Sequence, residues 1–178
     1  MLKRTPRSGF QFLGSGGESV AEHSFRTAMI GYSLAKMEPG IDPLKVVCMC
    51  LVHDLPEART GDQNYVNKRY VVADETEAMA DLAESLPFGD ELKDLLREYR
   101  NSETAEARLV HDADQLDLIV ELKEQNDLGN SYAEKWIHFA RQRLITSIGK
   151  KIAEEIVTTD STDWWFKGND AWWGKREE

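Results

Sequence analysis

The stretch that decides the fold is Asp42-Pro-Leu-Lys-Val-Val-Cys-Met-Cys-Leu-Val-His53-Asp54. Asp42 followed by Pro43 is a typical helix start, because an aspartate caps the first amide groups and proline fits the first turn. Residues 46–52 are all apolar, so we expect a helix that is apolar on every side and lies in the middle of a core. A histidine and an aspartate at the end of such a helix are costly unless they are paired or bind a metal.

Helical patterns continue on both sides of this segment. Ser19-Val-Ala-Glu22 is a capping box, and the helix that it opens is expected to reach about Met37. Pro56 and Gly61 interrupt the pattern, which predicts loops and short turns from 55 to 72. No useful alternating strand pattern occurs, so the sequence predicts an all-α, compact multi-helix bundle. Further helices are expected near 74–86, 90–100 and 103–125, with one or two over 131–157, and the first helix carries apolar residues at helical spacing at Ala21, Phe25, Ala28, Met29, Tyr32 and Ala35.

The composition excludes several classes of partner. The chain has 178 residues, enough for one domain with a real core, and its net charge is −10. Without a basic excess it is not expected to bind a nucleic-acid polymer or an anionic membrane, and no apolar run approaches the roughly 20 residues of a membrane span. Cys48 and Cys50 are expected to be buried free thiols of a cytoplasmic protein. A small anionic substrate needs only a local positive site, for which the candidates are Arg7, Arg59, Lys68 and Arg69.

Two His-Asp pairs occur, and their surroundings distinguish them. His53-Asp54 ends the most apolar helix, whereas His111-Asp112 lies on a charged helix. Arg108 and Asp112 are four residues apart there, which is typical of an ordinary surface pair. We therefore expect the first pair to be functional and the second to be solvated.

Further candidate metal ligands flank the first pair in the chain. His23 lies one turn into the first helix, and Asp114 interrupts an apolar stripe of the helix near 103–125. Two imidazoles and two carboxylates suit Mn, Fe, Co, Ni or Zn better than Ca or Mg. Asp112 and Asp117 flank Asp114, so the fourth ligand is open, although the Asp112 carboxylate would point about 160° away around the helix.

The ordered set His23, His53-Asp54 and Asp114 resembles the H…HD…D signature of HD-domain metal-dependent phosphohydrolases. Over roughly residues 2 to 155 the chain is similar to the bacterial 5′-deoxynucleotidase branch and its eukaryotic HD-domain-containing relatives. The segments that carry this resemblance are Glu18-Ser-Val-Ala-Glu-His23-Ser, His53-Asp-Leu-Pro-Glu57-Ala-Arg-Thr-Gly61-Asp62, Leu109 to Leu116, and Arg7-Ser-Gly-Phe10, where the branch has an arginine-plus-tryptophan element.

The resemblance implies one HD domain over 1–178, with the metal-site helices within about 18–125 and a Trp-rich tail at about 160–178. It also implies hydrolysis of 5′-deoxynucleoside monophosphates to deoxynucleoside and phosphate, and a homodimer. One divalent ion (Co, Mn, Fe, Ni, Zn or Mg) would activate water. By this resemblance His23, His53, Asp54 and Asp114 hold the ion, Glu57 orients or deprotonates water or protonates the leaving oxygen, Asp62 helps to place substrate or water, Arg7 holds the phosphate, and Phe10 stacks on the base.

Other interpretations stay open at this point. The same site could act on another nucleotide or small phosphate ester, or the domain could bind nucleotides without turnover. Arg7 lies in a basic terminus that could be frayed. Glu121 and Glu124 are expected on a solvated face, and His138 on the surface or in the core. The tail tryptophans are expected to cover the core or a dimer partner rather than to bind nucleic acid.

Overall fold

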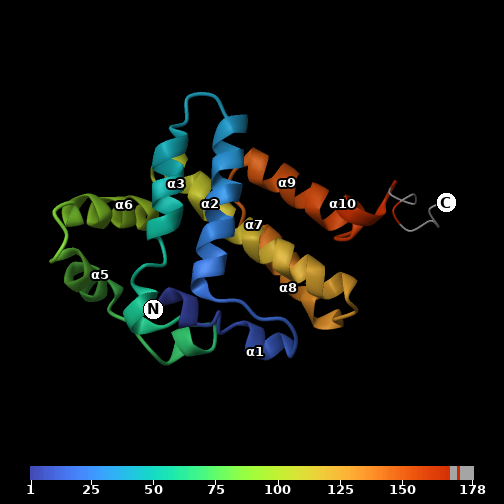
Figure 1. The fold of residues 1–178 in the computed structure, drawn as a ribbon, viewed down its shortest axis with the longest axis horizontal. Coiled ribbons are helices and arrows are strands. Elements are labelled where there is room, and N and C mark those ends of the chain that lie inside the picture. The colour runs from blue at the N-terminus through green and yellow to red at the C-terminus, as the bar shows by residue number, and fades with distance from the viewer. Residues whose placement is uncertain (169–171, 173–178) are drawn as a thin grey trace, which may run out of the picture.

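The structure, a computed structural model, describes residues 1–168 and 172. Within these residues it is built from helices, apart from one isolated antiparallel bridge between Pro6 and Ser19, which confirms the expected all-α class (Figure 1). In chain order the elements are the 3-10 helix η1 (Leu2–Arg4), α1 (Phe10–Leu13), α2 (Val20–Met37), α3 (Pro43–Val52), α4 (Glu57–Thr60), the 3-10 helix η2 (Asn67–Arg69), α5 (Glu75–Ala83), α6 (Gly89–Asn101), α7 (Ala105–Asp127), α8 (Ser131–Gln142), α9 (Ser147–Thr158) and α10 (Asp163–Phe166).

The helices begin where capping residues place them. Ser19 and Glu22 form both hydrogen bonds of the capping box at α2, and the Asp42 side chain accepts hydrogen bonds from two backbone amides at the start of α3. The segment from 55 to 72 contains only α4 and η2. Thr146 caps α9 and divides the segment 131–157 into α8 and α9.

Helix α7 is the centre of the core. It packs against α2, α3, α6, α8 and α9, and four of its apolar side chains larger than alanine have no exposed surface. It therefore provides a rigid support for any side chain that it points toward a neighbouring helix. These four side chains are Val110, Leu116, Ile119 and Leu122.

Helix α3 is buried on one side only, whereas the sequence predicts that core surrounds it on all sides. Val46, Met49 and Cys50 are fully buried, but Leu44 and Leu51 are 71% and 46% exposed. The reason is that α2, α6 and α7 cover only one side of α3. Gly31 of α2 allows the two helices to approach closely, because a Cβ atom there would collide with the Cys50 sulfur.

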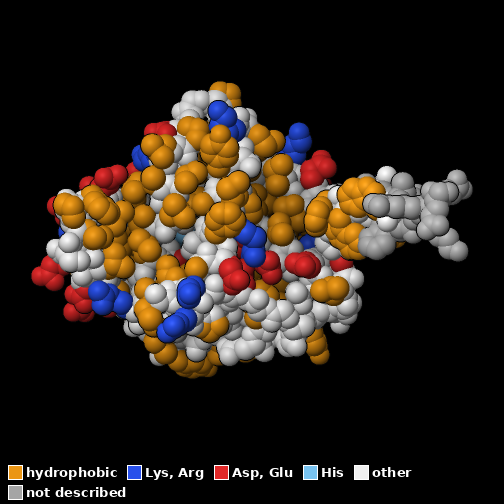
Figure 2. Space-filling model, in the orientation of Figure 1, with side chains coloured by type: hydrophobic (Ala, Val, Ile, Leu, Met, Phe, Trp, Pro, Cys, Tyr) orange, Lys and Arg blue, Asp and Glu red, His pale blue; other side chains and the backbone are white. Residues whose placement is uncertain are grey.

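An apolar face lies open along α2 and α3. Phe25, Met29 and Tyr32, which share one side of α2, are each about half-exposed or more. Apolar side chains gather over the area where α2 and α3 run side by side (Figure 2). The apolar spacing in this helix therefore marks its core face only in part: Ala28 and Ala35 are buried as expected, together with His23, Thr27 and Leu34.

The remaining expectations concern the thiols, membranes and the tail. Cys48 and Cys50 are both free, the first half-buried and the second buried. In the part of the chain that the structure describes, no helix combines the length and apolar character that a bilayer span requires. Trp164 and Trp172 are 82% and 69% exposed, so these two rings do not cover the core. Trp173 lies outside the described residues.

Candidate metal centre and active site

His53 caps the C-terminal end of α3 and is almost fully buried. Its Nδ1 lies 2.6 Å from the carbonyl oxygen of Cys50. A carbonyl can only accept, so Nδ1 donates, and the lone pair of Nε2 is directed away from the helix. The chain turns directly after α3, and this turn brings Asp54 beside the ring, with Oδ2 3.3 Å from His53 Nε2.

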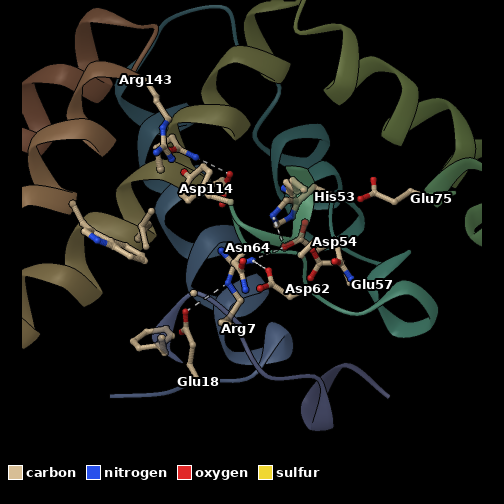
Figure 3. Close-up of a pocket in the computed structure, with 18 of the residues that line it drawn as sticks. Arg7, Glu18, His53, Asp54, Glu57, Asp62, Asn64, Glu75, Asp114 and Arg143 are labelled. Atoms are coloured by element: carbon tan, nitrogen blue, oxygen red, sulfur yellow. Dashed lines mark hydrogen bonds and ion pairs between the residues drawn. The ribbon is translucent and has the colours of Figure 1, made fainter. Parts of the chain in front are cut away.

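His23, on the buried face of α2, directs its Nε2 to the same point. This atom lies 3.2 Å from His53 Nε2, 3.4 Å from Asp54 Oδ2 and 3.3 Å from Asp114 Oδ1. The structure thus brings together all four residues that the sequence proposes as metal ligands, from α2, α3, the following turn and α7 (Figure 3 shows His53, Asp54 and Asp114).

These donor atoms fit a divalent ion. Ligand atoms that lie about 2.1 Å from a metal are about 3.0–3.4 Å apart in octahedral or tetrahedral geometry, which matches the separations between these atoms. The charges agree with the distances. Burial opposes protonation of His23, but hydrogen bonds to Asp114, Asp117 and Asp54 outweigh it and raise the pKa of the imidazole. The pocket between the donors therefore favours a positive charge at the point where an ion would bind.

A second layer of charge holds His23 from behind. Its Nδ1 lies 2.6 Å from Oδ2 of Asp117, which is fully buried. Arg26 donates from Nε to Asp117 Oδ1 at 2.8 Å and also pairs with Glu18 and Glu121. Asp117 is thus placed to fix the tautomer in which Nε2 is free to bind a metal.

Glu121 is more buried than the sequence predicts. It was expected on a solvated face, but its side chain is only 14% exposed, and burial raises its pKa to about 7 despite the ion pair with Arg26. Glu124 is exposed, as expected. The role of Asp117 at His23 was not predicted, because its proximity in the sequence to Asp114 suggested only a competing ligand.

Glu57 begins α4 and is 9% exposed. Its Oε2 has no hydrogen-bond partner among the described residues. Burial, together with the charges of Asp54 and Asp62, raises the pKa of Glu57 to about 9. In the metal-free protein this shift favours the protonated carboxyl group at neutral pH, and Glu57 also lines the cavity beside the candidate ligands.

The N-terminal segment is held in place rather than frayed. Arg7 donates from its backbone amide to Glu18 O at 2.9 Å, and its Nη1 lies 3.2 Å from Asp54 Oδ2 and 3.0 Å from Asp62 Oδ1. Asp62 Oδ2 accepts hydrogen bonds from the amide and the hydroxyl of Ser8 at 2.6 and 2.7 Å. Asp62 thus anchors the segment that presents Arg7 to the site (Figure 3).

Several of these groups line one cavity of about 270 Å³, namely Arg7, His53, Asp54, Glu57, Asp62 and Asp114. Its apolar wall contains Phe10 together with Trp136, which the sequence analysis did not single out. Arg7 and Lys68 line the cavity, but Arg59 and Arg69 are not among its lining residues, so only half of the proposed positive funnel is present. Other lining residues not foreseen from the sequence are Asn64, Tyr65, Tyr99, Gln115, Leu118 and Arg143.

The second His-Asp pair is not solvated, which corrects the sequence prediction. Asp112 is fully buried and accepts hydrogen bonds from the backbone amides of Ile145 and Thr146, both at 2.8 Å, and from the Thr146 hydroxyl at 2.6 Å. Arg108 donates instead to the carbonyl of Glu103. Asp112 therefore fastens the turn between α8 and α9 to α7, and this turn lies far along the chain from the pair itself.

Comparison with known proteins gives consistent results. Residues 1–157 match the HD domain family. The 5′-deoxynucleotidase HDDC2 of Dictyostelium discoideum is 36% identical over 118 residues, covering 60% of this chain and 62% of that protein, and the Bos taurus 5′-deoxynucleotidase HDDC2 is 33% identical, covering 72% and 65%. The chain thus spans less than two thirds of the length of these relatives. The PH0347 protein from Pyrococcus horikoshii OT3 superposes with a TM-score of 0.72 at 33% identity, covering 88% of this chain and 93% of that one.

Proposed function

Because the chain belongs to the HD domain family, we propose that it is a metal-dependent phosphohydrolase that removes the phosphate from 5′-deoxynucleoside monophosphates. The observation that carries the proposal is the convergence of two imidazole Nε2 atoms and two carboxylates beside the buried carboxyl group of Glu57. The relatives named 5′-deoxynucleotidase support the choice of substrate. The free thiols support a reducing compartment such as the cytoplasm.

The ion would be held by His23, His53, Asp54 and Asp114. Bound there, a divalent ion supplies Lewis-acid stabilisation of phosphoryl charge and lowers the pKa of water. Asp117 and the Cys50 carbonyl keep the two rings in the tautomers that this binding needs.

Glu57 acts as the general acid in this proposal. Burial raises the pKa of Glu57 in the metal-free protein, which favours a protonated carboxyl group, and its unpartnered Oε2 would donate that proton to the leaving O5′ of the substrate. The raised pKa favours this role over deprotonation of water, because a carboxyl group that holds a proton can donate it but cannot accept another.

Arg7 and the apolar wall bind the substrate. Arg7 pairs through Nη1 with Asp54 and Asp62 and through Nε with Glu18, so its Nη2 would be the group that donates to phosphate oxygens. Phe10 and Trp136 offer aromatic surface to the base. Asp62 does not need to touch the substrate, because its contacts to Ser8 and Arg7 already place the N-terminal segment.

The test is phosphate release from 5′-deoxynucleoside and ribonucleoside monophosphates with Co²⁺, Mn²⁺, Mg²⁺, Zn²⁺ or chelator. We expect turnover that requires metal, favours deoxynucleotides and falls about 10²–10⁴-fold in Glu57→Gln, which keeps the side-chain volume. The exposed Glu84→Gln, directly after the end of α5, is the control. Nucleotide binding without hydrolysis under every metal would overturn the proposal in favour of a binding protein.

We also propose a homodimer formed through the open apolar face of α2 and α3. Phe25, Met29 and Leu51 leave an apolar surface that a second copy can cover with the same residues, as a twofold interface requires. Light scattering after size exclusion should give twice the chain mass, and Met29→Glu should give the mass of one chain with unchanged helical content. A monomeric wild-type protein at all concentrations would contradict this assignment.

A further inference from the structure

Arg143 lines the cavity beside the aromatic wall that is assigned to the base. It follows α8 directly and lies two helical turns after Trp136, and both side chains line the cavity. In Figure 3 Asp114 lies between Arg143 at one end of the labelled group and Arg7 toward the other. Arg143 is therefore placed to meet a part of the substrate other than the phosphate held by Arg7.

Three contacts hold Arg143 in position. Its Nη1 donates to Gln115 Oε1 at 3.1 Å, and its guanidinium carbon lies over the ring of Tyr65, 4.6 Å from the centroid. The third contact is indirect, because Asp112 accepts hydrogen bonds from the backbone amides of Ile145 and Thr146, shortly after Arg143 in the chain. A side chain fixed in this way loses little entropy when it binds a ligand.

Arg143 also has no counter-charge, unlike Arg7, which pairs with Asp54 and Asp62. Both of its direct side-chain partners are neutral, and within residues 1–168 and 172 no ion pair joins it to a carboxylate. Burial lowers the pKa of its guanidinium for the same reason. Its N–H groups therefore favour a ligand edge that carries hydrogen-bond acceptors and no donor.

Gln115 shows which edge of a base would face Arg143. Its Nε2 donates to Asp114 Oδ2 at 3.0 Å while its Oε1 accepts from Arg143, so one amide group separates the guanidinium from a candidate metal ligand. Arg143 thus lies near the phosphate end of the bound substrate. In the common anti conformation of a 5′-nucleotide, the edge on the side of the phosphate is the one with N7 of a purine or C5 of a pyrimidine.

The bases differ on this edge in the groups that they offer to a donor. Guanine and hypoxanthine present two acceptors, N7 and O6, to which an arginine can donate two hydrogen bonds. Adenine and cytosine present an amino group instead, which would meet the N–H groups of Arg143 donor to donor and leave both without a partner. Thymine has a single acceptor there, next to its methyl group.

We propose that Arg143 is a specificity-determining residue that selects a 6-oxopurine base, so that 2′-deoxyguanosine 5′-monophosphate is preferred among the deoxynucleoside monophosphates. This inference rests on the proposed function, because it takes the metal centre and Arg7 as the place of the phosphate. Phe10 and Trp136 then contact the face of the base while Arg143 binds its edge.

Binding of hydrolysis-resistant substrate analogues tests the base preference. Calorimetry on the full chain loaded with Mn²⁺ would use 2′-deoxynucleosides in which a methylenephosphonate replaces the 5′-phosphate, because the P–C bond is not hydrolysed. The bases are guanine, hypoxanthine, 7-deazaguanine, adenine and cytosine. We expect the guanine and hypoxanthine analogues to bind about tenfold or more tightly than those of adenine and cytosine. The 7-deazaguanine analogue, which keeps O6 but lacks N7, should bind more weakly than the guanine analogue.

Variants assign the preference to the residue. Arg143→Met should reduce the affinity ratio of guanine to adenine analogue to about one, mainly by weakening the guanine analogue. Arg143→Lys should keep only part of the ratio, because an ammonium group lacks the paired N–H groups of a guanidinium. Arg141→Met is the control and should leave the ratio unchanged, since this exposed arginine of α8 pairs with Glu154 and does not line the cavity.

Three results would overturn the assignment. The first is an adenine or cytosine analogue that binds as tightly as the guanine analogue, including no binding of any. The second is a hypoxanthine analogue as weak as adenine, which would assign the preference to the 2-amino group of guanine. The third is a loss by the same factor for all analogues in Arg143→Met, which would make Arg143 a positioning residue for Gln115 and Asp114.

Failure of the proposed function gives a different result. In that case no metal supports phosphate release from any deoxynucleoside monophosphate, while the base preference in the binding of the analogues persists. Phosphate release at equal kcat/KM from the guanine and adenine nucleotides, together with equal binding of their analogues, would leave the proposed function in place and remove only the role of Arg143.

Discussion

At the residue scale, the surroundings of Glu57 determine the pKa of its carboxyl group. Its pKa is raised from about 4.5 to about 9, first by burial and then by Asp54 and Asp62. In metal-free protein the folded state therefore keeps a proton, between these pH values, that the unfolded chain releases. Because the folded state binds more protons, the contribution of Glu57 to stability falls as pH rises through this window, by at most about 1.4 kcal/mol per pH unit.

Urea unfolding of the metal-free protein at pH 6 to 8.5 checks this sign. Wild type should lose stability relative to Glu57→Gln as the pH rises, since glutamine has no proton to lose. Glu84→Gln, at an exposed residue directly after α5, should follow the wild-type curve at every pH. Parallel curves for Glu57→Gln and wild type would show that Glu57 is already ionised in the folded state.

The orienting role of Asp117 gives a second residue-scale prediction. Asp117→Asn removes the charge that holds His23 Nδ1, and Mn²⁺ or Co²⁺ affinity should fall about 10–100-fold in a calorimetric titration. Glu121→Gln is the control, because it also removes a partner of Arg26 but does not touch His23. Equal losses in both variants would attribute the effect to Arg26 rather than to the contact with the imidazole.

The sequence could single out individual site residues only where neighbouring residues in the chain pointed to them. His53 and Asp54 could be selected because the apolar helix before them makes an unpaired ionisable group costly. Asp117 and Arg143 could not, because their partners lie far along the chain, His23 94 residues from Asp117 and Gln115 28 residues from Arg143. Such contacts exist only after the helices have packed.

At the scale of elements, Asp112 joins α7 to the turn between α8 and α9. Asp112→Ala would leave two backbone amides and a hydroxyl without their acceptor, in a part-buried turn. The free energy of unfolding should fall by about 2–4 kcal/mol in urea titrations, whereas Asp81→Ala, at an exposed site on α5, should change it by less than about 0.5 kcal/mol. A small effect of Asp112→Ala would mean that water replaces the carboxylate.

The sequence predicts where the helices begin and end better than it predicts which side of each helix is buried. Ser19, Asp42 and the Pro56–Gly61 interruption act within one turn of the chain, so the sequence shows them directly. The face that a helix buries depends on its neighbours. Phe25 and Met29 follow helical spacing but are exposed, while the polar His23 and Thr27 are buried against α7 and the site.

At the scale of the whole molecule, the candidate metal centre connects α2, α3 and α7, which pack against one another. An ion that binds the folded state should therefore stabilise the entire fold, by about 2.7 kcal/mol when its concentration is 100 times its Kd. Thermal melts should show a higher Tm with Mn²⁺ than with chelator, and His53→Ala should abolish the difference. A metal-dependent increase that persists in His53→Ala would locate the binding ion elsewhere.

The long separation between His23 and Asp117 has a consequence for the newly made protein. A ribosome that has just added His23 must add 94 more residues before Asp117 exists. At 5–20 residues per second this interval lasts roughly 5 to 20 s. During this interval the nascent α2 and α3 can leave the ribosome while His23 still lacks its Asp117 partner. The complete set of side chains at the candidate metal centre is therefore assembled only late in translation.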